Sequence, residues 1–327
     1  TYPDLAGVGV TAGEMMQTLS FPDREQWLWK TYGLGVKDAL RTQPDRSVRF
    51  IHRVWNTGLD SIQDAFEDYP GTLDTSFKYA KARIYSTPRP EFADSLIVSL
   101  RQHGLRAWWN LRNDDLFCLR WGDPAYVRAF IKNMPPEETA GFHMGSDGYV
   151  WARNFSVKDP QQRGQLEIDR HWYNFMLWGR LGYDPSLDRS FFEDTLKQRY
   201  PKADAALLYD AWASASRIIP QVNRFFFRSG DFLFIPEGCQ GLREGFLTVD
   251  HFIAGSPLPG MPEISIPDYL KLDEKADRSN VCTPPQVAQN LDRFAADAQR
   301  GCEALMSAGN LSPTLTELLT DLQAMAW

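Results

Sequence analysis

Five short apolar runs in the first half of the chain are each followed by polar or aromatic residues that could do chemistry. A strand that only builds a core has no need of such residues, because a polar group that leaves water without a partner costs free energy. In α/β proteins, catalytic and binding groups commonly lie where strands end. We therefore select as candidates the residues at the five run ends, which are Glu14, His52, Arg53, Trp55, Lys78, Arg83, Trp109, Asn110, Arg112, Asp114, Asp115, Asp147, Tyr149, Trp151 and Arg153.

Three of these candidates are carboxylic acids. Glu14 follows the apolar run 5–10 and comes directly after Gly13, a position that suits a general acid, although a solvated loop residue would look the same. Asp114 and Asp115 are adjacent, and neighbouring carboxylates raise one another's pKa, which favours acid–base chemistry. The alternative for this pair is that one of them caps a helix. We predict that Glu14, Asp114 and Asp115 are the catalytic residues.

Cationic candidates lie on the second, third and fourth runs. His52 and Arg53 stand inside an apolar run and need partners; Arg53 can bind a carboxylate or sulfate through two hydrogen bonds, or form a structural ion pair with a neighbouring strand. Lys78 and Arg83 fall on opposite faces of a strand with period two, although lysines are more often solvated than bound to a ligand. We predict that Arg53, Lys78, Arg83 and Arg112 bind an anionic group.

The aromatic residues indicate what the ligand is. Most of the 11 Trp, 12 Tyr and 20 Phe build the core. An indole ring beside Asp, Asn or Arg also suits a sugar, because a sugar presents C–H faces and hydroxyl edges. We predict that Trp109, Tyr149 and Trp151 stack on sugar rings, and that the remaining polar and aromatic candidates bind the substrate with them; these are His52, Trp55, Asn110, Asp147 and Arg153.

Composition excludes several other kinds of function. The 327 residues are 43% hydrophobic and 24% charged, which is typical of a globular chain with one large domain or two smaller ones. The net charge of -7 argues against nucleic acid as a partner. Because there is no CxxC pair and the five His are scattered, we expect no metal site and no cofactor. No apolar stretch approaches about 18 residues, so we expect no membrane span.

Cysteine usage and the N-terminus bear on the compartment. Cys282 and Cys302 could form a disulfide in an oxidising compartment, but free thiols are favoured. We recognise no signal peptide. We expect a periplasmic or secreted protein rather than a cytoplasmic one.

The order of predicted elements indicates the fold. The first half alternates strand-like runs at residues 5–10, 48–55, 76–85, 105–111 and 140–144 with helical stretches at 23–40, 61–66, 90–103 and 124–133. This alternation predicts βαβ units and a parallel sheet. Later helices are expected at 165–179, 189–199, 203–217, 287–308 and 314–326. We predict an α/β fold in which residues 1–157 form the later part of a (β/α)8-type barrel and residues 158–327 form an all-helical C-terminal region.

The number of strands raises a question about the barrel. Five strands are visible, whereas a closed barrel needs eight. Either three strands are missing from this chain or the sheet is open, but no Gly-rich phosphate loop of the Rossmann type follows any strand. Residues 5–10 lack the Lys or Pro that protects an exposed edge. We therefore expect a central strand there, whose second partner comes from residues before Thr1 or from a segment absent from this chain.

Several of these residues resemble the motifs of the α-glucuronidases of glycoside hydrolase family 67. That family carries a Gly-Ser-Asp turn with a following Trp, and then a helix with an Asn-Trp-Tyr segment and a Gly-Arg-Leu segment that ends in Pro. It also has a Lys-Tyr strand and a Gly-rich strand before its general acid. The matching residues are Gly145-Ser146-Asp147 with Trp151, Trp172-Tyr173-Asn174-Phe175, Gly179-Arg180-Leu181-Gly182-Tyr183-Asp184-Pro185, Lys78-Tyr79 and Gly7 to Glu14.

The resemblance covers about residues 3–200 and implies a barrel hydrolase with a helical domain behind it. It implies that Glu14 is the general acid and that Asp114 lies nearest one of the family's two bases. The other base would fall near Arg83, where this chain has no matching carboxylate. This departure, together with the surplus of Lys and Arg, implies a related family that acts on a different, anionic sugar.

We therefore expect an α-glucuronidase-like glycoside hydrolase that cleaves an anionic or decorated oligosaccharide or polysaccharide with inversion. One alternative is a non-catalytic carbohydrate-binding protein on a degenerate barrel, which would not need Glu14 opposite Asp114. Another is a polysaccharide lyase, which could use His52 or Tyr79 as base and Lys78 to neutralise a uronate. The helical region is also a candidate surface for a homodimer.

Overall fold

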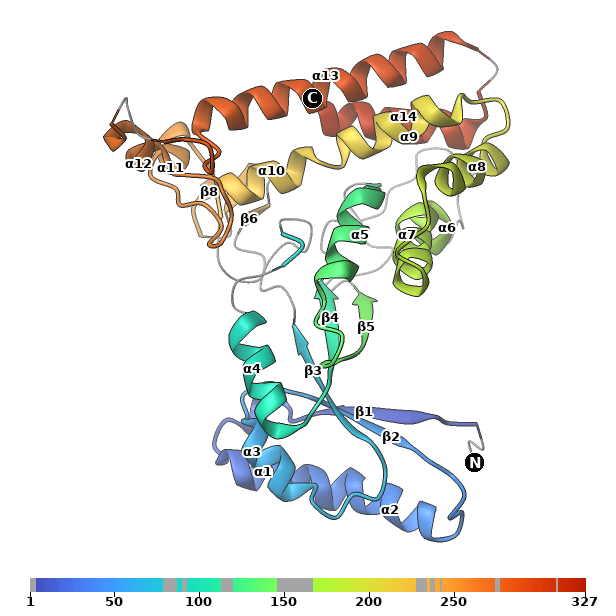
Figure 1. Cartoon of the computed structure of the whole chain (residues 1–327), viewed down its shortest axis with the longest axis vertical. Coiled ribbons are helices and arrows are strands. Elements are labelled where there is room, and N and C mark those ends of the chain that lie inside the picture. Colours follow the sequence, from blue (N-terminus) through green and yellow to red (C-terminus); the bar gives the residue numbers. More distant parts are fainter. Residues whose placement is uncertain are drawn as a thin grey trace. The chain divides into compact units, whose positions relative to one another are not determined.

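The structure, a computed structural model, describes residues 4–78, 87–89, 93–112, 120–145, 167–227, 234–235, 239–241, 243–273, 277–309 and 311–327 (Figure 1). The chain divides into two compact units, which we describe separately. The first contains a five-stranded parallel sheet and the helices that alternate with its strands. The second contains the C-terminal helices together with α5 (Pro124–Asn133), although the sequence pattern placed this helix in the first domain. The predicted boundary at residue 157 lies outside the described residues.

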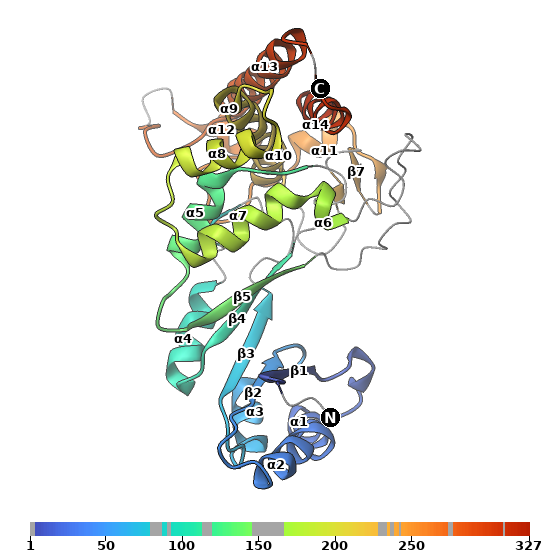
Figure 2. The ribbon, with the colours of Figure 1, turned by 90° about the vertical axis from the view of Figure 1, so that its right-hand side faces the viewer.

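The sheet of the first unit has its strands in the order of the sequence (Figure 2). Those strands are β1 (Gly7–Thr11), β2 (Arg49–Arg53), β3 (Leu73–Lys78), β4 (Ala107–Arg112) and β5 (Thr139–Gly145). A sheet that never reverses its strand order is typical of a barrel wall rather than of a doubly wound sheet, in which the order reverses at a switch point. The α/β prediction is therefore confirmed, while a closed barrel of eight strands stays a prediction.

The helices of the first unit follow the predicted stretches closely. The stretch 23–40 forms α1 (Phe21–Leu28), one turn of π-helix (Trp29–Gly33) and α2 (Leu34–Arg41) without a break. The other helices are α3 (Leu59–Ala65), α4 (Ala93–His103) and a short 3-10 helix, η1 (Glu14–Met16). Their apolar faces bury one face of the sheet, as shown by the ring of Phe66 after α3, which lies 4.8 Å from Phe50 of β2 and 5.4 Å from Trp29.

Strand β1 lies at the open end of the described sheet, so its predicted second strand partner stays a prediction. It pairs with β2 and forms an edge of the described sheet, with no second strand partner among the residues that the structure describes. Its residues are half-buried or exposed, unlike the alternately buried residues of β2. This arrangement is compatible with a second partner that comes from residues before Thr1 or from a segment absent from this chain, as the composition of the strand predicts.

The second unit is built mainly from helices. They are α5, α6 (Glu167–Arg170), α7 (Trp172–Tyr183), α8 (Arg189–Arg199), α9 (Ala205–Ala215), α10 (Ile218–Phe225), α11 (Val249–Ile253), α12 (Ile266–Lys271), α13 (Pro284–Ser307) and α14 (Pro313–Ala326). The long helix α13 packs along α9 and α14. Gly301 permits this close packing, because a Cβ at that position would lie 2.7 Å from the Cβ of Ala211 in α9.

The prediction that the C-terminal region is all-helical is wrong. Three two-residue strands form a small antiparallel sheet there, namely β6 (Phe234–Ile235), β7 (Gln240–Gly241) and β8 (Gly245–Phe246). Strand β8 begins at Gly245, whose φ of 73° lies in the left-handed region that favours glycine. Strands this short leave no period-two pattern in the sequence, so the Gly-rich segment resembled a plain loop.

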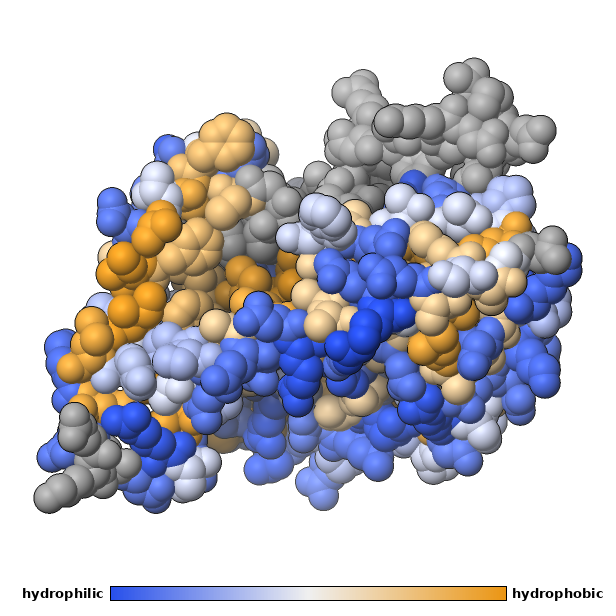
Figure 3. Space-filling model, turned by 90° about the horizontal axis from the view of Figure 1, so that it is seen from above, coloured by the Kyte–Doolittle hydropathy of each residue, from blue (hydrophilic) through white to orange (hydrophobic). Residues whose placement is uncertain are grey.

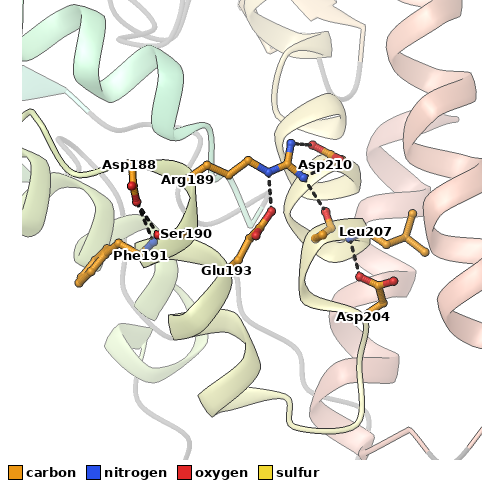
Figure 4. Close-up of polar contacts among 9 residues, drawn as sticks. Asp188, Arg189, Ser190, Phe191, Glu193, Asp204, Leu207 and Asp210 are labelled. Carbon is orange, nitrogen blue, oxygen red and sulfur yellow. Dashed lines mark hydrogen bonds and ion pairs between the residues drawn. The ribbon is translucent and has the colours of Figure 1, made fainter.

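Helix ends in the second unit carry the caps that make their bounds predictable (Figure 4). Asp188 accepts a hydrogen bond from the backbone N–H of Phe191 at the start of α8, and Asp204 accepts one from Leu207 at the start of α9. Arg189 of α8 reaches across to α9, where its guanidinium pairs with both carboxylate oxygens of Asp210 at 2.9 Å. These contacts fix the α8–α9 corner.

The surface of the molecule seen from above is largely hydrophilic, with apolar groups gathered toward the left of the view (Figure 3). Large apolar side chains that the second unit exposes include Phe246, Val249, Ile253 and Leu270. Homodimerisation through this unit stays a prediction.

No helix in the described ranges is long and apolar enough to cross a membrane. Cys282 and Cys302 are free thiols.

Candidate functional site

The two faces of the parallel sheet carry different side chains because successive residues of a strand point to opposite sides. Phe50 and His52 of β2 face the helices and are buried. Arg49, Ile51 and Arg53 alternate with them and are half-buried on the other face. Residues that are paired in register across parallel strands share a face, so the strand pairing shows which candidates lie together.

The register brings together one residue from each of four neighbouring strands. Thr11 of β1 pairs with Arg53 of β2, and Arg53 pairs with Ser76 of β3. Ser76 in turn pairs with Trp108 of β4. These residues line a hollow of about 490 Å³ on the face of the sheet away from the helices, and its walls are formed by Gly9, Val10, Thr11, Ile51, Arg53, Ser76, Trp108, Asn110 and His143. The hollow lies toward the carboxyl ends of the strands, where ligands of parallel α/β folds bind.

Two of the predicted binding residues, Arg53 and Asn110, line this hollow. Trp55 is half-buried, and its ring lies 5.4 Å from the guanidinium of Arg53, a cation–π contact. Lys78 pairs in register with Asn110, and Arg112 follows Asn110 by two residues, so both positions belong to the same face of the sheet. The structure therefore brings five predicted positions together at one edge.

Two other predicted binding residues, His52 and Trp109, belong to the opposite face and are completely buried. His52 lies 2.5 Å from a carboxylate oxygen of Glu25 in α1. The indole N–H of Trp109 donates to Thr139, and its ring packs near Phe77. Both build the core between sheet and helices and offer no surface to a ligand, so we remove them from the candidate site. Trp108, which the candidate set did not include, stands in the hollow instead.

The predicted catalytic acids are described only in part. Glu14 begins the short helix η1, three residues after the end of β1, so its backbone stands just beyond the carboxyl end of that strand. The remaining predicted residues fall outside the described residues; these are Arg83, Asp114, Asp115, Asp147, Tyr149, Trp151 and Arg153.

The hollow contains a cationic side chain and an imidazole ring. Arg53 is half-buried, and no carboxylate of the described residues lies within ion-pair distance of its guanidinium. His143, which the candidate set also missed, lies near it at the end of β5. Partial exclusion of water from the His143 ring, and then the positive charge of Arg53, lower the pKa of this imidazole below its usual value. At neutral pH the hollow thus offers one fixed cation beside a neutral imidazole.

A buried carboxylate supports the wall of the hollow and was not anticipated. Asp74 of β3 lies on the same face as Ser76 and accepts a hydrogen bond of 3.1 Å from the indole N–H of Trp108. It also pairs with Arg49 at 3.0 Å. A signal for this contact exists in the sequence, because Asp74, Ser76 and Lys78 alternate on one face of β3.

Gly141 of β5 makes room for the same indole. A Cβ at this position would lie 2.7 Å from the six-membered ring of Trp108, so only glycine lets this ring lie against β5. Within the described part of the chain, no group of three or more His, Cys, Asp or Glu residues is arranged to hold a metal ion. The groups of the hollow that can contact a ligand are the guanidinium of Arg53, the imidazole of His143, the amide of Asn110 and the indole of Trp108.

Comparison with known proteins adds a fold relationship. No protein-family model matches the chain, and no curated protein matches its sequence. A solved structure of a GH138 enzyme targeting pectin rhamnogalacturonan II is similar, with a TM-score of 0.72 and 16% sequence identity. The similarity covers 98% of this chain and 48% of that one, so this chain spans about half the length of the enzyme that it matches. At this identity the similarity shows a shared fold, and the neighbour is a glycoside hydrolase from a family other than family 67.

Proposed function

We propose that this chain carries a glycoside hydrolase site that cleaves O-glycosyl bonds in an anionic or decorated polysaccharide, with pectin as the first class of substrate to test. The observation that carries the proposal is the hollow at the carboxyl edge of the sheet, where Arg53 lies without a carboxylate partner among the described residues. Asn110 and Ser76 supply hydrogen bonds to hydroxyl groups, and the flat face of Trp108 suits a sugar ring. The fold shared with an enzyme that targets a pectin supports the same class.

The residue roles follow the family 67 resemblance and form the finer part of the proposal. Glu14 protonates the leaving oxygen, and Asp114 or Asp115 activates water, which gives inversion in an α-glucuronidase-like reaction. Inversion requires the two carboxyl groups to lie roughly 6.5–9.5 Å apart. Arg53, Lys78, Arg83 and Arg112 neutralise the anionic group of the sugar, and the stacking and hydrogen-bonding residues of the later loop complete the site; these are Asp147, Tyr149, Trp151 and Arg153.

The test is turnover of oligogalacturonides and of pectin, measured by release of reducing sugar, with ¹H NMR to read the anomer that forms first. Glu14→Gln should lower the rate by about 100-fold or more, because general acid catalysis contributes on that order. The control is Glu67→Gln, which changes an exposed acid of the same unit and should leave turnover unchanged. Retention of most activity in Glu14→Gln would remove Glu14 from the mechanism.

The two aspartates should separate in the same assay. If one is the base, its Asn variant should lose about 100-fold in rate or more, while the other, as a helix cap, should lose about 1 kcal/mol of stability with little loss of rate. Equal and small losses of rate in Asp114→Asn and Asp115→Asn, with unchanged melting temperatures, would contradict both roles.

A second candidate function is a polysaccharide lyase, and His143 is the observation that favours it. A neutral imidazole beside Arg53 has the groups that proton abstraction next to a neutralised uronate requires. Because His52 is buried, His143 replaces it as the imidazole base in this alternative. A lyase leaves an unsaturated sugar that absorbs in the ultraviolet, whereas a hydrolase does not. Binding of the oligosaccharide without either product would indicate a non-catalytic binding protein.

A further inference from the structure

We infer that Glu25 and His52 form a buried positioning pair that fixes the loop after β2, and with it Arg53 and Trp55 of the hollow. The inference rests on the proposed function in so far as Arg53 binds substrate. Both side chains of the pair are completely buried, on the helix side of the sheet, and neither touches the hollow. Their effect on a ligand would therefore pass through the backbone of β2 and its loop.

The hydrogen bonds of the pair lead directly to that loop. One carboxylate oxygen of Glu25 lies 2.5 Å from Nε2 of His52, and the other accepts a hydrogen bond of 2.7 Å from the hydroxyl of Thr57. Nδ1 of His52 lies 3.0 Å from the carbonyl oxygen of Arg53. A carbonyl oxygen can only accept, so Nδ1 carries a proton and donates it. Glu25 thus anchors both ends of the segment 53–57.

The neighbouring residue of α1 holds the middle of the same segment. The guanidinium of Arg24 donates to the carbonyl oxygen of Asn56 at 2.6 Å and to that of Leu19 at 3.0 Å, and its side chain is buried. Asn56 has a φ of 51°, in the left-handed region that Asn adopts more readily than most non-glycine residues and that is typical of turns. Two successive residues of one helix therefore hold this turn.

The alternation of strand residues explains why such a pair would set the direction of Arg53. His52 and Arg53 are consecutive, so when the ring of His52 is fixed on the helix side, the side chain of Arg53 must point to the opposite face. Trp55 lies under the guanidinium of Arg53, so a shift of the loop would displace both groups. The core pair thus determines how accurately the cation of the hollow is placed, and a displacement of about 1 Å in a binding group can cost on the order of 100-fold.

The experiment compares three variants in the full chain. Glu25→Leu replaces the carboxylate group, which contacts His52 and Thr57, with an apolar side chain of similar volume. Glu25→Gln is the conservative rescue, because its amide oxygen can accept from Thr57 and its amide N–H can donate to Nε2 of His52. Thr57→Val removes only the hydrogen bond from the hydroxyl of Thr57 to Glu25. This variant tests the same idea if Glu25→Leu does not fold. Asp38→Asn, at an exposed position of α2, is the control.

Two readouts are needed. Hydrogen exchange without ligand should rise about tenfold or more in peptides covering residues 53–58 of Glu25→Leu and Thr57→Val, while α4 (Ala93–His103) keeps its protection. Titration with oligogalacturonides, followed by tryptophan fluorescence, should show binding weakened about 10- to 100-fold in Glu25→Leu and near the parent value in Glu25→Gln.

Each outcome has a defined meaning. Unchanged exchange at residues 53–58, or an equal rise in exchange across the whole first unit, would overturn the positioning role, as would full affinity in Glu25→Leu. If the exchange pattern is as expected but no form binds the oligosaccharide, the pair fixes the loop as inferred and the proposed function is what fails.

Discussion

Removal of Asp74 tests whether the wall of the hollow depends on the buried carboxylate beneath it. Asp74 is almost fully buried and accepts from Trp108 at 3.1 Å and from Arg49 at 3.0 Å, with Arg106 at 3.9 Å. The guanidinium of Arg49 also lies 5.6 Å from the ring of Trp108. One carboxylate thus holds together an indole and a cation from the two neighbouring strands.

The expected cost follows from these contacts. A hydrogen bond to a charged group is worth about 1.5–3 kcal/mol and a neutral one about 1 kcal/mol. The lower end of the 1.5–3 kcal/mol range applies to the contact with Arg49, because the side chain of Arg49 is 34% exposed and water can solvate its charge when the carboxylate is removed. Asp74→Ala should therefore lower the free energy of unfolding of the first unit by about 3 kcal/mol. Asp74→Asn keeps an acceptor for Trp108 and should cost about half as much.

Hydrogen exchange at increasing urea measures this quantity for the first unit separately from the second. Asp68→Ala is the matched control, because Asp68 also pairs with a cation, Lys37 at 3.2 Å, but is 77% exposed. Exposed pairs contribute about 0–1 kcal/mol, so the control should change little. If Asp74→Ala costs no more than Asp68→Ala, or if Asp74→Asn costs as much as Asp74→Ala, the reasoning is refuted.

Two further predictions concern the second unit. Burial, and then two nearby arginines, lower the pKa of His171 to about 3, so protonation of this ring favours the unfolded chain. The free energy of unfolding should therefore be unaffected by His171 above pH 6.5 and should fall by about 2 kcal/mol by pH 5. In thermal melts across this pH range, His171→Gln should flatten the slope. At the α8–α9 corner, Asp204→Ala should cost about 1 kcal/mol as a lost helix cap, whereas Arg189→Met should cost about 0.5–1 kcal/mol, because Arg189 is 48% exposed. The first idea fails if the slope persists in His171→Gln, and the second fails if urea melts show neither loss.

Helices with a strong period and clear caps were predictable from the sequence. The stretch 189–199 coincides with α8, whose N-cap is Asp188, and the stretch 314–326 coincides with α14 apart from Pro313 at its start. The helices α10, α11 and α12 were missed, because each has at most eight residues; α10 follows α9 after two residues, and α11 and α12 lie among segments rich in Gly and Pro. Short elements of this kind owe their order to tertiary contacts rather than to their own pattern.

The start of β3 was misplaced for a different physical reason. It begins at Leu73, three residues before the predicted run, because its first residues include Asp74 and Thr75. Polar residues argue against a buried strand only when they lack partners, and both of these have one: Asp74 pairs with Arg49, and Thr75 donates to the carbonyl oxygen of Arg106. Such partners come from other strands and cannot be read from the run itself.

The candidate site could be predicted as a place more reliably than as a set of side chains. Strand ends point to an edge of the sheet where two predicted residues, Arg53 and Asn110, line a hollow, and the function of this hollow stays a prediction. Within each strand, however, the choice between neighbours depends on which face meets the helices. His52 was selected with Arg53, and Trp109 in preference to Trp108, although period two allows only one of each pair to face the hollow.

The same alternation, applied across the sheet, assigns three cationic residues to positions on one face. Arg53, Lys78 and Arg112 occupy positions of the same face, on three neighbouring strands, near the point where each strand ends. The positions are offset along the strands, because Arg53 pairs in register with Ser76, two residues before Lys78, and Lys78 pairs with Asn110, two residues before Arg112. Asp74, the buried carboxylate of this face, is already paired with Arg49 toward the start of the strands. The proposal that the other end of this face binds a carboxylate-bearing sugar therefore depends on strand parity rather than on any single residue.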